Sequence, residues 1–205
     1  RRCKEDVWMI NKINKVIHYC WFGKGEKNDR IKHCIESWRK YLPDYEIIEW
    51  NEDNFDVNII PYTSEAYKAK KYAFVSDYAR FWILYHFGGL YFDTDVEIIK
   101  PIYDIIERGA FMGCENSAMK NNGSLPGVAP GLGLGANSGL GLYNELLTLY
   151  AQLSFINNDG SYNLETIVTY TTELLAKHGL QSTNQIQQCA VEYSDISACS
   201  LLFSE

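Results

Sequence analysis

Apolar and polar positions in the first 115 residues follow two periods, one typical of strands and one of helices. Short runs rich in β-branched and aromatic residues predict strands at 15–22, 45–50, 90–92 and 110–114. Between the first two strands, apolar residues fall on one face of a helix that Asn28 or Asp29 caps, namely Ile31, Ile35, Trp38 and Leu42. A second helical region is expected from Ser64 to Phe87, where Gly88 and Gly89 end it.

This alternation of strands and helices predicts an α/β fold with βαβ units and an open, mixed, mostly parallel sheet. Residues 116–141 are rich in Gly, Ser, Asn and Pro, which predicts a mobile or ligand-facing loop. Helices are expected at 142–155 and 164–178. Because no linker divides the chain, we expect one domain over residues 1–205, with its core at 12–115 and a second part at 116–205.

Charge and cysteine content narrow the classes of partner. The chain has 205 residues and a formal net charge of −7, which argues against nucleic acid, because phosphate backbones require clustered Lys and Arg. The six cysteines lack the spacing of zinc sites and predict reduced thiols in a cytosolic protein: Cys3, Cys20, Cys34, Cys114, Cys189 and Cys199. We find neither a signal peptide nor an apolar run of the ~20 residues that span a bilayer.

Two acidic residues, Asp93 and Asp95, come directly after the predicted strand at 90–92. Ligands of open α/β sheets bind beyond the carboxyl ends of strands, and carboxylates suit Mn²⁺ or Mg²⁺. On an extended chain the two side chains face opposite ways. Both can bind one ion only if the chain bends between them. Otherwise, one binds the metal and the other binds a sugar or ribose. The alternative is a pair of solvated turn residues.

The helix predicted at 73–87 is apolar nearly all round, yet it contains Ser76, Asp77 and Arg80. These three polar residues share one helix face. One interpretation is an internal salt bridge that closes the core. The other is a face directed into the cleft of Asp93 and Asp95, where Asp77 binds sugar hydroxyls and Arg80 offsets phosphate charge.

Trp21 ends the first predicted strand, where its indole is placed to stack on a nucleobase. Gly23 follows closely and lets backbone approach a ligand. The alternative for Trp21 is an ordinary core position. We expect His18, on the same strand, to point into the fold rather than act as a catalytic base.

Four motifs in order, IHYCWFG, YEIIEWN, AFVSDYAR and GGLYFDTDVE, resemble glycosyltransferase family 32, the glycosyltransferase sugar-binding region containing a D-x-D motif. The S-D-x-x-R helix followed by D-x-D is also similar to the glucosyltransferase domains of large glucosylating toxins. The resemblance spans about residues 12–115. It implies a GT-A fold, with a Rossmann-like nucleotide-sugar-binding core at 12–115 and an acceptor-side part at 116–205, and a retaining transfer.

The resemblance also implies a role for each site residue. Trp21 becomes the base-stacking residue, and Ser76, Asp77 and Arg80 become donor-sugar contacts. Asp93 becomes a ribose and sugar contact beside the metal, and Asp95 the direct ligand of Mn²⁺ or Mg²⁺. Family members usually carry a further His or Trp near the donor phosphates in a C-terminal segment. The tail at 185–205 has no such His, so we expect a truncated chain or a site that closes differently.

The expected function is metal-dependent transfer of a sugar from a UDP- or GDP-sugar to a saccharide or glycan acceptor. The resemblance places it in bacterial capsular polysaccharide or lipopolysaccharide synthesis, in the cytoplasm with peripheral association at the inner membrane face. One alternative is a sugar- or nucleotide-binding module without turnover. Another is a D-x-D phosphatase, which Glu97 disfavours because such enzymes prefer a small or Thr-like residue there.

Overall fold

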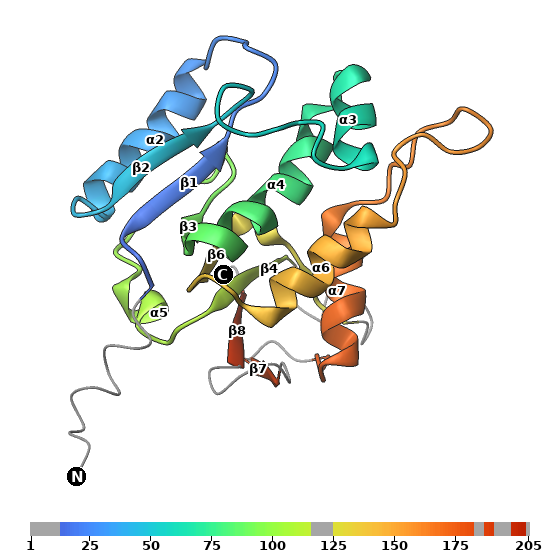
Figure 1. Cartoon of the computed structure of the whole chain (residues 1–205). Helices are drawn as coiled ribbons and strands as arrows, with labels where there is room; N and C mark the ends of the chain where they lie inside the picture. The colour runs from blue at the N-terminus through green and yellow to red at the C-terminus, as the bar shows by residue number, and fades with distance from the viewer. Residues whose placement is uncertain (1–12, 116–124, 183–186, 191–197, 204–205) are drawn as a thin grey trace.

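An eight-stranded sheet forms the centre of the computed structural model, which describes residues 13–115, 125–182, 187–190 and 198–203 (Figure 1). The strand order is β2-β1-β3-β6-β4-β8-β7, and β5 pairs with β4. The strands are β1 (Val16–Cys20), β2 (Glu46–Trp50), β3 (Gly89–Tyr91), β4 (Phe111–Glu115), β5 (Gly127–Val128), β6 (Leu134–Ala136), β7 (Gln187–Ala190) and β8 (Ala198–Phe203).

The directions of the strands confirm an open, mixed sheet. Strand β1 runs parallel to both β2 and β3, and β4 runs parallel to β8. The other pairs are antiparallel, because β6 runs opposite to its neighbours β3 and β4, as do β5 to β4 and β7 to β8. The parallel arrangement predicted for most of the sheet therefore holds for its first three strands and for one pair in the second half.

Helices cover both faces of the sheet. The helices are α2 (Asp29–Tyr41), α3 (Pro61–Lys68), α4 (Tyr72–Phe87), α5 (Tyr103–Ile106), α6 (Gly141–Ala151) and α7 (Ile167–Lys177). One apolar core lies between the sheet and α2, around the fully buried Trp38. The other lies between the opposite face and α3, α4, α6 and α7, around Phe81 and Tyr150. Figure 1 shows α2 and the α4–α6–α7 group on different sides of the strands.

The helical region predicted from Ser64 to Phe87 is in fact two helices. Helix α3 begins with Pro61 at its first turn, where a missing backbone N–H costs nothing. Helix α4 begins at Tyr72, and between them Lys70 adopts a positive φ of 59°. A lysine carries no signal for that conformation, so the sequence pattern does not reveal the break.

Residues 116–124 of the glycine-rich segment lie outside the described residues, and much of its described part, 125–141, belongs to the core rather than to a loop. Strand β6 within it is buried in the middle of the sheet. A Cβ on Gly133 would lie 3.2 Å from the ring of Phe92, and one on Gly135 would lie 2.3 Å from the ring of Phe111. These glycines are needed because aromatic rings pack directly on the backbone. Within the described part, the turn at 129–132 lines the pocket described below, and for this turn the ligand-facing role stays a prediction.

His18 lies in the core, as predicted, and is 2% exposed. The indole N–H of Trp50 donates to its Nδ1 at 3.0 Å, so Nε2 carries the proton and donates to the Gly88 carbonyl at 3.0 Å. Burial lowers the pKa of His18 to about 4, although the Gly88 carbonyl opposes that change. The residue is therefore a neutral link between β2, β1 and the end of α4.

Two further sequence predictions concern cysteines and membrane spans. Cys20, Cys34 and Cys114 are buried. The side chains of the other three cysteines lie outside the described part of the chain. Within residues 13–115, 125–182, 187–190 and 198–203, none of the helices has the length and apolar character required to cross a bilayer.

Candidate active site

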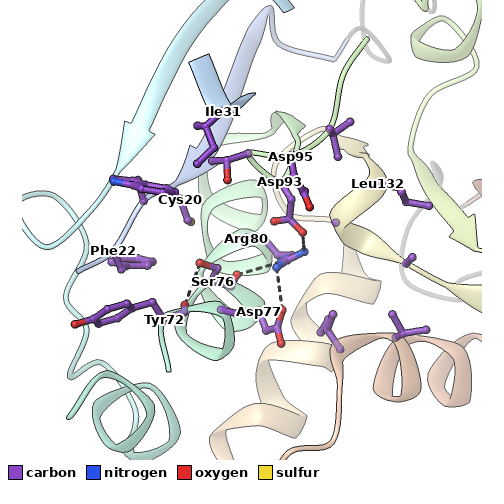
Figure 2. Close-up of a pocket in the computed structure, with 18 of the residues that line it drawn as sticks. Cys20, Phe22, Ile31, Tyr72, Ser76, Asp77, Arg80, Asp93, Asp95 and Leu132 are labelled. Atoms are coloured by element: carbon purple, nitrogen blue, oxygen red, sulfur yellow. Dashed lines mark hydrogen bonds and ion pairs between the residues drawn. The ribbon is translucent and has the colours of Figure 1, made fainter. Parts of the chain in front are cut away.

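A pocket of about 700 Å³ opens at the carboxyl ends of β1 and β3 (Figure 2). It brings together all the residues that the sequence singled out as candidates: Trp21, Ser76, Asp77, Arg80, Asp93 and Asp95. They come from the end of β1, from helix α4 and from the segment after β3. Parallel strands place their carboxyl ends at one edge of the sheet, which explains why residues distant in sequence meet here.

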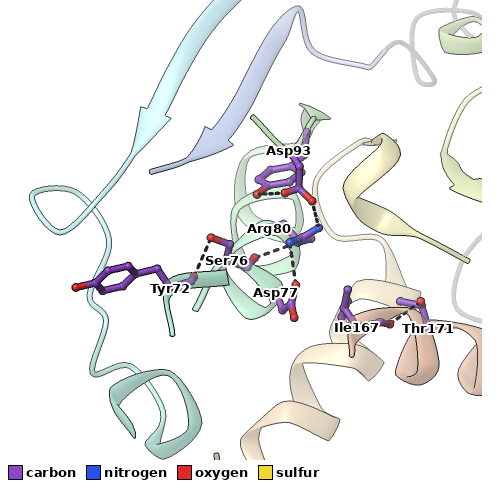
Figure 3. Close-up of polar contacts among 8 residues, drawn as sticks. Tyr72, Ser76, Asp77, Arg80, Asp93, Ile167 and Thr171 are labelled. Atoms are coloured by element: carbon purple, nitrogen blue, oxygen red, sulfur yellow. Dashed lines mark hydrogen bonds and ion pairs between the residues drawn. The ribbon is translucent and has the colours of Figure 1, made fainter. Parts of the chain in front are cut away.

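Arg80 is the centre of the pocket floor and its side chain is 4% exposed. Its Nη2 donates to Asp77 Oδ1 at 2.8 Å, and its Nη1 donates to Asp93 Oδ2 at 3.2 Å. Its Nε donates to the Ser76 carbonyl at 3.1 Å, and its guanidinium lies 5.0 Å from the centre of the Tyr91 ring. Figure 3 shows this network, in which Arg80 joins α4 to the segment after β3.

The charges of this network depend on burial. Burial raises the pKa of Asp77 to about 6, with Arg80 lowering it and Asp93 raising it further. Burial alone would lower the pKa of Arg80, but Asp93 and the other negative groups beside it outweigh that effect and raise the pKa. Arg80 therefore stays positive. The internal salt bridge considered from the sequence exists, and it also faces the pocket.

Asp93 and Asp95 differ in their surroundings. The chain bends after β3, where the Val96 N–H donates to the Asp93 carbonyl at 3.0 Å. Asp93 points inward, and its Oδ1 also accepts from the Tyr91 hydroxyl at 3.1 Å. Asp95 is exposed, lines the same pocket, and forms no hydrogen bond or ion pair with the residues that the structure describes. Figure 2 shows both carboxylates at the upper edge of the pocket.

This arrangement fits a hard divalent cation. Among the described residues, no group of three or more His, Cys, Asp or Glu side chains gathers into a complete metal site. Mg²⁺ and Mn²⁺ accept one or two carboxylates and complete their ligand shell with phosphate oxygens and water. Asp95 is available as such a ligand and Asp93 lies beside it, so the donor set matches a metal that arrives with a diphosphate.

Aromatic side chains form one wall of the pocket. Trp21 is half-buried, its indole N–H donates to the Gly25 carbonyl at 2.7 Å, and Lys27 Nζ lies 5.4 Å from its ring centre. Tyr72 also lines the pocket, and a Cβ on Gly23 would be 2.2 Å from the Tyr72 ring. Gly23 therefore gives room to Tyr72, not directly to a ligand as predicted.

Several pocket residues were missed by the sequence analysis. Arg30 lies in the first turn of α2, and Glu115 ends β4. In open α/β folds the carboxyl ends of parallel strands and the first turns of the following helices lie at the edge of the sheet that binds ligands. Arg30 and Glu115 occupy such positions, so this rule could have predicted them. Ile167 and Val168, at the start of α7, also line the pocket. They carried no signal, because apolar residues on a helix usually pack into a core.

Part of the chain that contains this site matches a known protein family. Residues 28–112 match the family described as "Glycosyltransferase sugar-binding region containing DXD motif". The match contains the whole Arg80 network together with Asp95, and it starts after Trp21. The match therefore covers α2, α4 and the segment after β3, and the family resemblance predicted from the sequence is confirmed there.

Two individual proteins are similar to this chain. Inositol phosphoceramide mannosyltransferase 1 of Schizosaccharomyces pombe is 30% identical over 114 residues, which cover 50% of this chain and 34% of the relative. The chain thus spans about a third of that relative's length. The solved structure of PaToxG Glycosyltransferase has a TM-score of 0.58 at 19% identity, covering 80% of this chain and 69% of that one. At this identity the likeness shows the fold alone: the chain shares the α/β fold of that glycosyltransferase, as predicted.

Proposed function

We propose that this chain transfers a sugar from a UDP- or GDP-sugar to a saccharide acceptor and depends on Mn²⁺ or Mg²⁺. One observation carries the proposal: the exposed carboxylate of Asp95, which has no partner among the described residues, lies in the same pocket as the Asp77–Arg80–Asp93 network. An exposed carboxylate keeps its ligand capacity, whereas Asp93 is already engaged by Arg80 and Tyr91. We therefore assign Asp95 to the metal and Asp93 mainly to the sugar.

The pocket offers separate contacts for each part of the donor. Trp21 presents a ring for the base at the end of β1. Asp95, with Asp93 beside it, would hold the metal, which would supply positive charge to the diphosphate. The carboxylates of Asp77 and Asp93 would accept hydrogen bonds from ribose and sugar hydroxyls, the Ser76 hydroxyl would donate or accept one, and Arg80 fixes both carboxylates in place. This division makes Arg80 an organiser of the sugar-binding carboxylates.

Transfer breaks the bond between the anomeric carbon and the diphosphate, and negative charge accumulates on the leaving group. A divalent cation, when bound, stabilises that charge. Asp77 and Asp93 orient the sugar so that one face meets the acceptor hydroxyl. In the retaining course that the resemblance implies, the hydroxyl approaches on the side from which the diphosphate departs. The leaving phosphate then takes the acceptor proton.

The choice of donor and the cellular setting belong to the same proposal. The curated relative is named a mannosyltransferase, so nucleotide-linked mannose is the first donor to test. Its name also contains inositol phosphoceramide, an inositol-bearing phospholipid, whereas for this chain we propose a saccharide or glycan acceptor. We keep cell-surface polysaccharide synthesis, in the cytoplasm at the inner membrane face, as the proposed role.

The decisive experiment replaces Asp95 by Asn. We expect the variant to fold normally, because the side chain is exposed, and to lose manganese-dependent binding of the nucleotide-sugar. The matched control is Asp53→Asn, an exposed aspartate outside the pocket. Calorimetry with UDP- and GDP-sugars, with and without manganese, measures the effect. Wild-type affinity in Asp95→Asn would refute the assignment.

Donor hydrolysis separates this function from its rivals. A transferase slowly releases nucleoside diphosphate from the donor when manganese is present. A phosphatase releases inorganic phosphate from phosphomonoesters instead, and a binding module without turnover releases neither.

A further inference from the structure

The pocket has two chemically different walls. Trp21, Phe22 and Tyr72 form an aromatic wall at the end of β1. The other wall comes from the second half of the chain and contains Glu115 together with four apolar residues, Ala129, Leu132, Ile167 and Val168. Figure 2 shows Phe22 and Tyr72 on one side and Leu132 on the other, and Figure 3 shows Ile167 across the Arg80 network from Tyr72.

Specific contacts hold the second wall in place. The Thr171 hydroxyl of α7 donates to the Val128 carbonyl of β5 at 2.7 Å, and the Val128 N–H donates to the Thr172 hydroxyl at 2.8 Å. Glu115 pairs with Gly127 in the adjoining antiparallel ladder. A Cβ on Gly127 would lie 3.2 Å from Val168 Cγ1, so strand and helix are in close contact. This wall is therefore a fixed part of the fold.

Glu115 differs from the other carboxylates in the pocket. Asp77 and Asp93 are paired with Arg80, and Asp95 is assigned to the metal. The carboxylate of Glu115 is exposed and forms no hydrogen bond or ion pair with the described residues. A negative group here disfavours a bound diphosphate, because like charges repel across a short distance. The wall is thus suited to a partner other than the donor.

We propose that this second wall is the acceptor subsite, and that Glu115 selects an uncharged saccharide as the acceptor. The inference rests on the proposed glycosyltransferase function and extends it to the acceptor. A neutral sugar ring has hydroxyls that donate to Glu115 and C–H faces that pack on Leu132 and Ile167. An anionic sugar, such as a uronic acid, would place its carboxylate against that of Glu115.

The chemical step needs no proton transfer to Glu115. The acceptor oxygen forms a bond to the anomeric carbon while the bond from that carbon to the diphosphate breaks. The electron pair of the broken bond leaves with the diphosphate, and the acceptor proton passes to the departing phosphate oxygen. Glu115 holds neighbouring hydroxyls of the acceptor so that the reacting oxygen faces the donor.

The test compares neutral and anionic sugars as ligands. Saturation-transfer NMR in the presence of nucleoside diphosphate and Mg²⁺ would measure binding of methyl mannoside, methyl glucoside, methyl galactoside and methyl glucuronide. We expect wild type to bind at least one neutral glycoside at least about tenfold more tightly than the glucuronide, since like-charge contacts are costly. Glu115→Gln should weaken neutral binding and remove the discrimination. Glu173→Gln, on the exposed face of α7 outside this pocket, is the matched control.

Donor binding and donor hydrolysis are measured on the same variants. If they are absent in wild type, the proposed function fails. If they are present but Glu115→Gln binds and discriminates glycosides as wild type does, the acceptor assignment is wrong. Failure of every neutral glycoside to bind wild type, with donor binding intact, would equally overturn it. A normal melting temperature for Glu115→Gln ensures that altered binding is not due to misfolding.

Discussion

Gly131 offers a sharp test of whether the Arg80–Asp93 pair organises the donor site. A Cβ at this position would lie 2.0 Å from Asp93 Oδ2, 3.0 Å from its Cγ and 3.2 Å from Arg80 Nη1. The Gly131 carbonyl also accepts from the Asp93 N–H at 3.0 Å, so the two segments cannot separate easily. We therefore expect Gly131→Ala to displace the Asp93 side chain.

The size of the effect follows from these distances. A carbon and an oxygen in contact rest roughly 3.3 Å apart, so the carboxylate must retreat by roughly 1 Å or more. That movement breaks its 3.2 Å hydrogen bond to Arg80. Overpacking of this kind costs about 1–3 kcal/mol of stability. Losing a charge-assisted contact that orients the sugar-binding carboxylate should lower donor affinity about tenfold to a hundredfold.

The assay is calorimetric titration of the nucleotide-sugar with manganese, together with thermal melting. Gly25→Ala is the control, because a Cβ at Gly25 would have no heavy atom within 4 Å. Wild-type donor affinity in Gly131→Ala would refute the reasoning, even if the melting temperature falls. That result would mean that Gly131 matters for packing and that Asp93 is not needed in its observed position.

Three further predictions concern Asp77, Arg80 and Lys70. Because burial raises the pKa of Asp77 to about 6, donor affinity should fall as pH drops through 6. The free energy of unfolding should instead rise as pH drops through 6, because the folded state binds the Asp77 proton more tightly than the unfolded state. Asp77→Asn should abolish both pH dependences, which donor titrations and thermal melts from pH 5 to 8 measure. Arg80→Lys should weaken binding of the nucleotide-sugar about tenfold while free nucleotide still binds, because one ammonium cannot replace the guanidinium that holds both Asp77 and Asp93. An equal loss of affinity for nucleotide and nucleotide-sugar would contradict this. Lys70→Gly should raise the unfolding free energy by up to about 1 kcal/mol, since it relieves a positive φ, and a decrease in denaturant melts would show that the Lys70 backbone is unstrained.

Much of the candidate site was predictable because short-range rules act on it. Asp93 and Asp95 follow a strand that is apolar throughout, and ligands of open α/β sheets bind at that end. Asp77 and Arg80 stand out because two charged residues interrupt an apolar helix. The cap of α2 was also correct, with Asn28 accepting from the Ile31 N–H at 3.0 Å. Each of these signals lies within a few residues of the feature that it predicts.

The errors arose where long-range contacts decide the outcome. The glycines of the 131–135 segment resembled a loop, yet Gly133 and Gly135 receive the rings of Phe92 and Phe111, which lie more than twenty residues away. The break at Lys70 has no local signal, because the apolar pattern continues into α4.

By itself, the sequence determined the alternation of strands and helices, the family resemblance and four charged residues of the pocket, Asp77, Arg80, Asp93 and Asp95. Hydrophobic periodicity and strand-end chemistry are local properties, so they can be read without a fold. Only the tertiary structure decided that Arg80 joins Asp77 to Asp93, that Asp95 remains unpaired among the described residues, and that Glu115 and Ile167 line the same pocket. The Arg80 contacts depend on how α4 packs beside β3, and the positions of Glu115 and Ile167 depend on how β4 and α7 pack against the first half of the chain. Packing between separate segments leaves no periodic trace in the sequence.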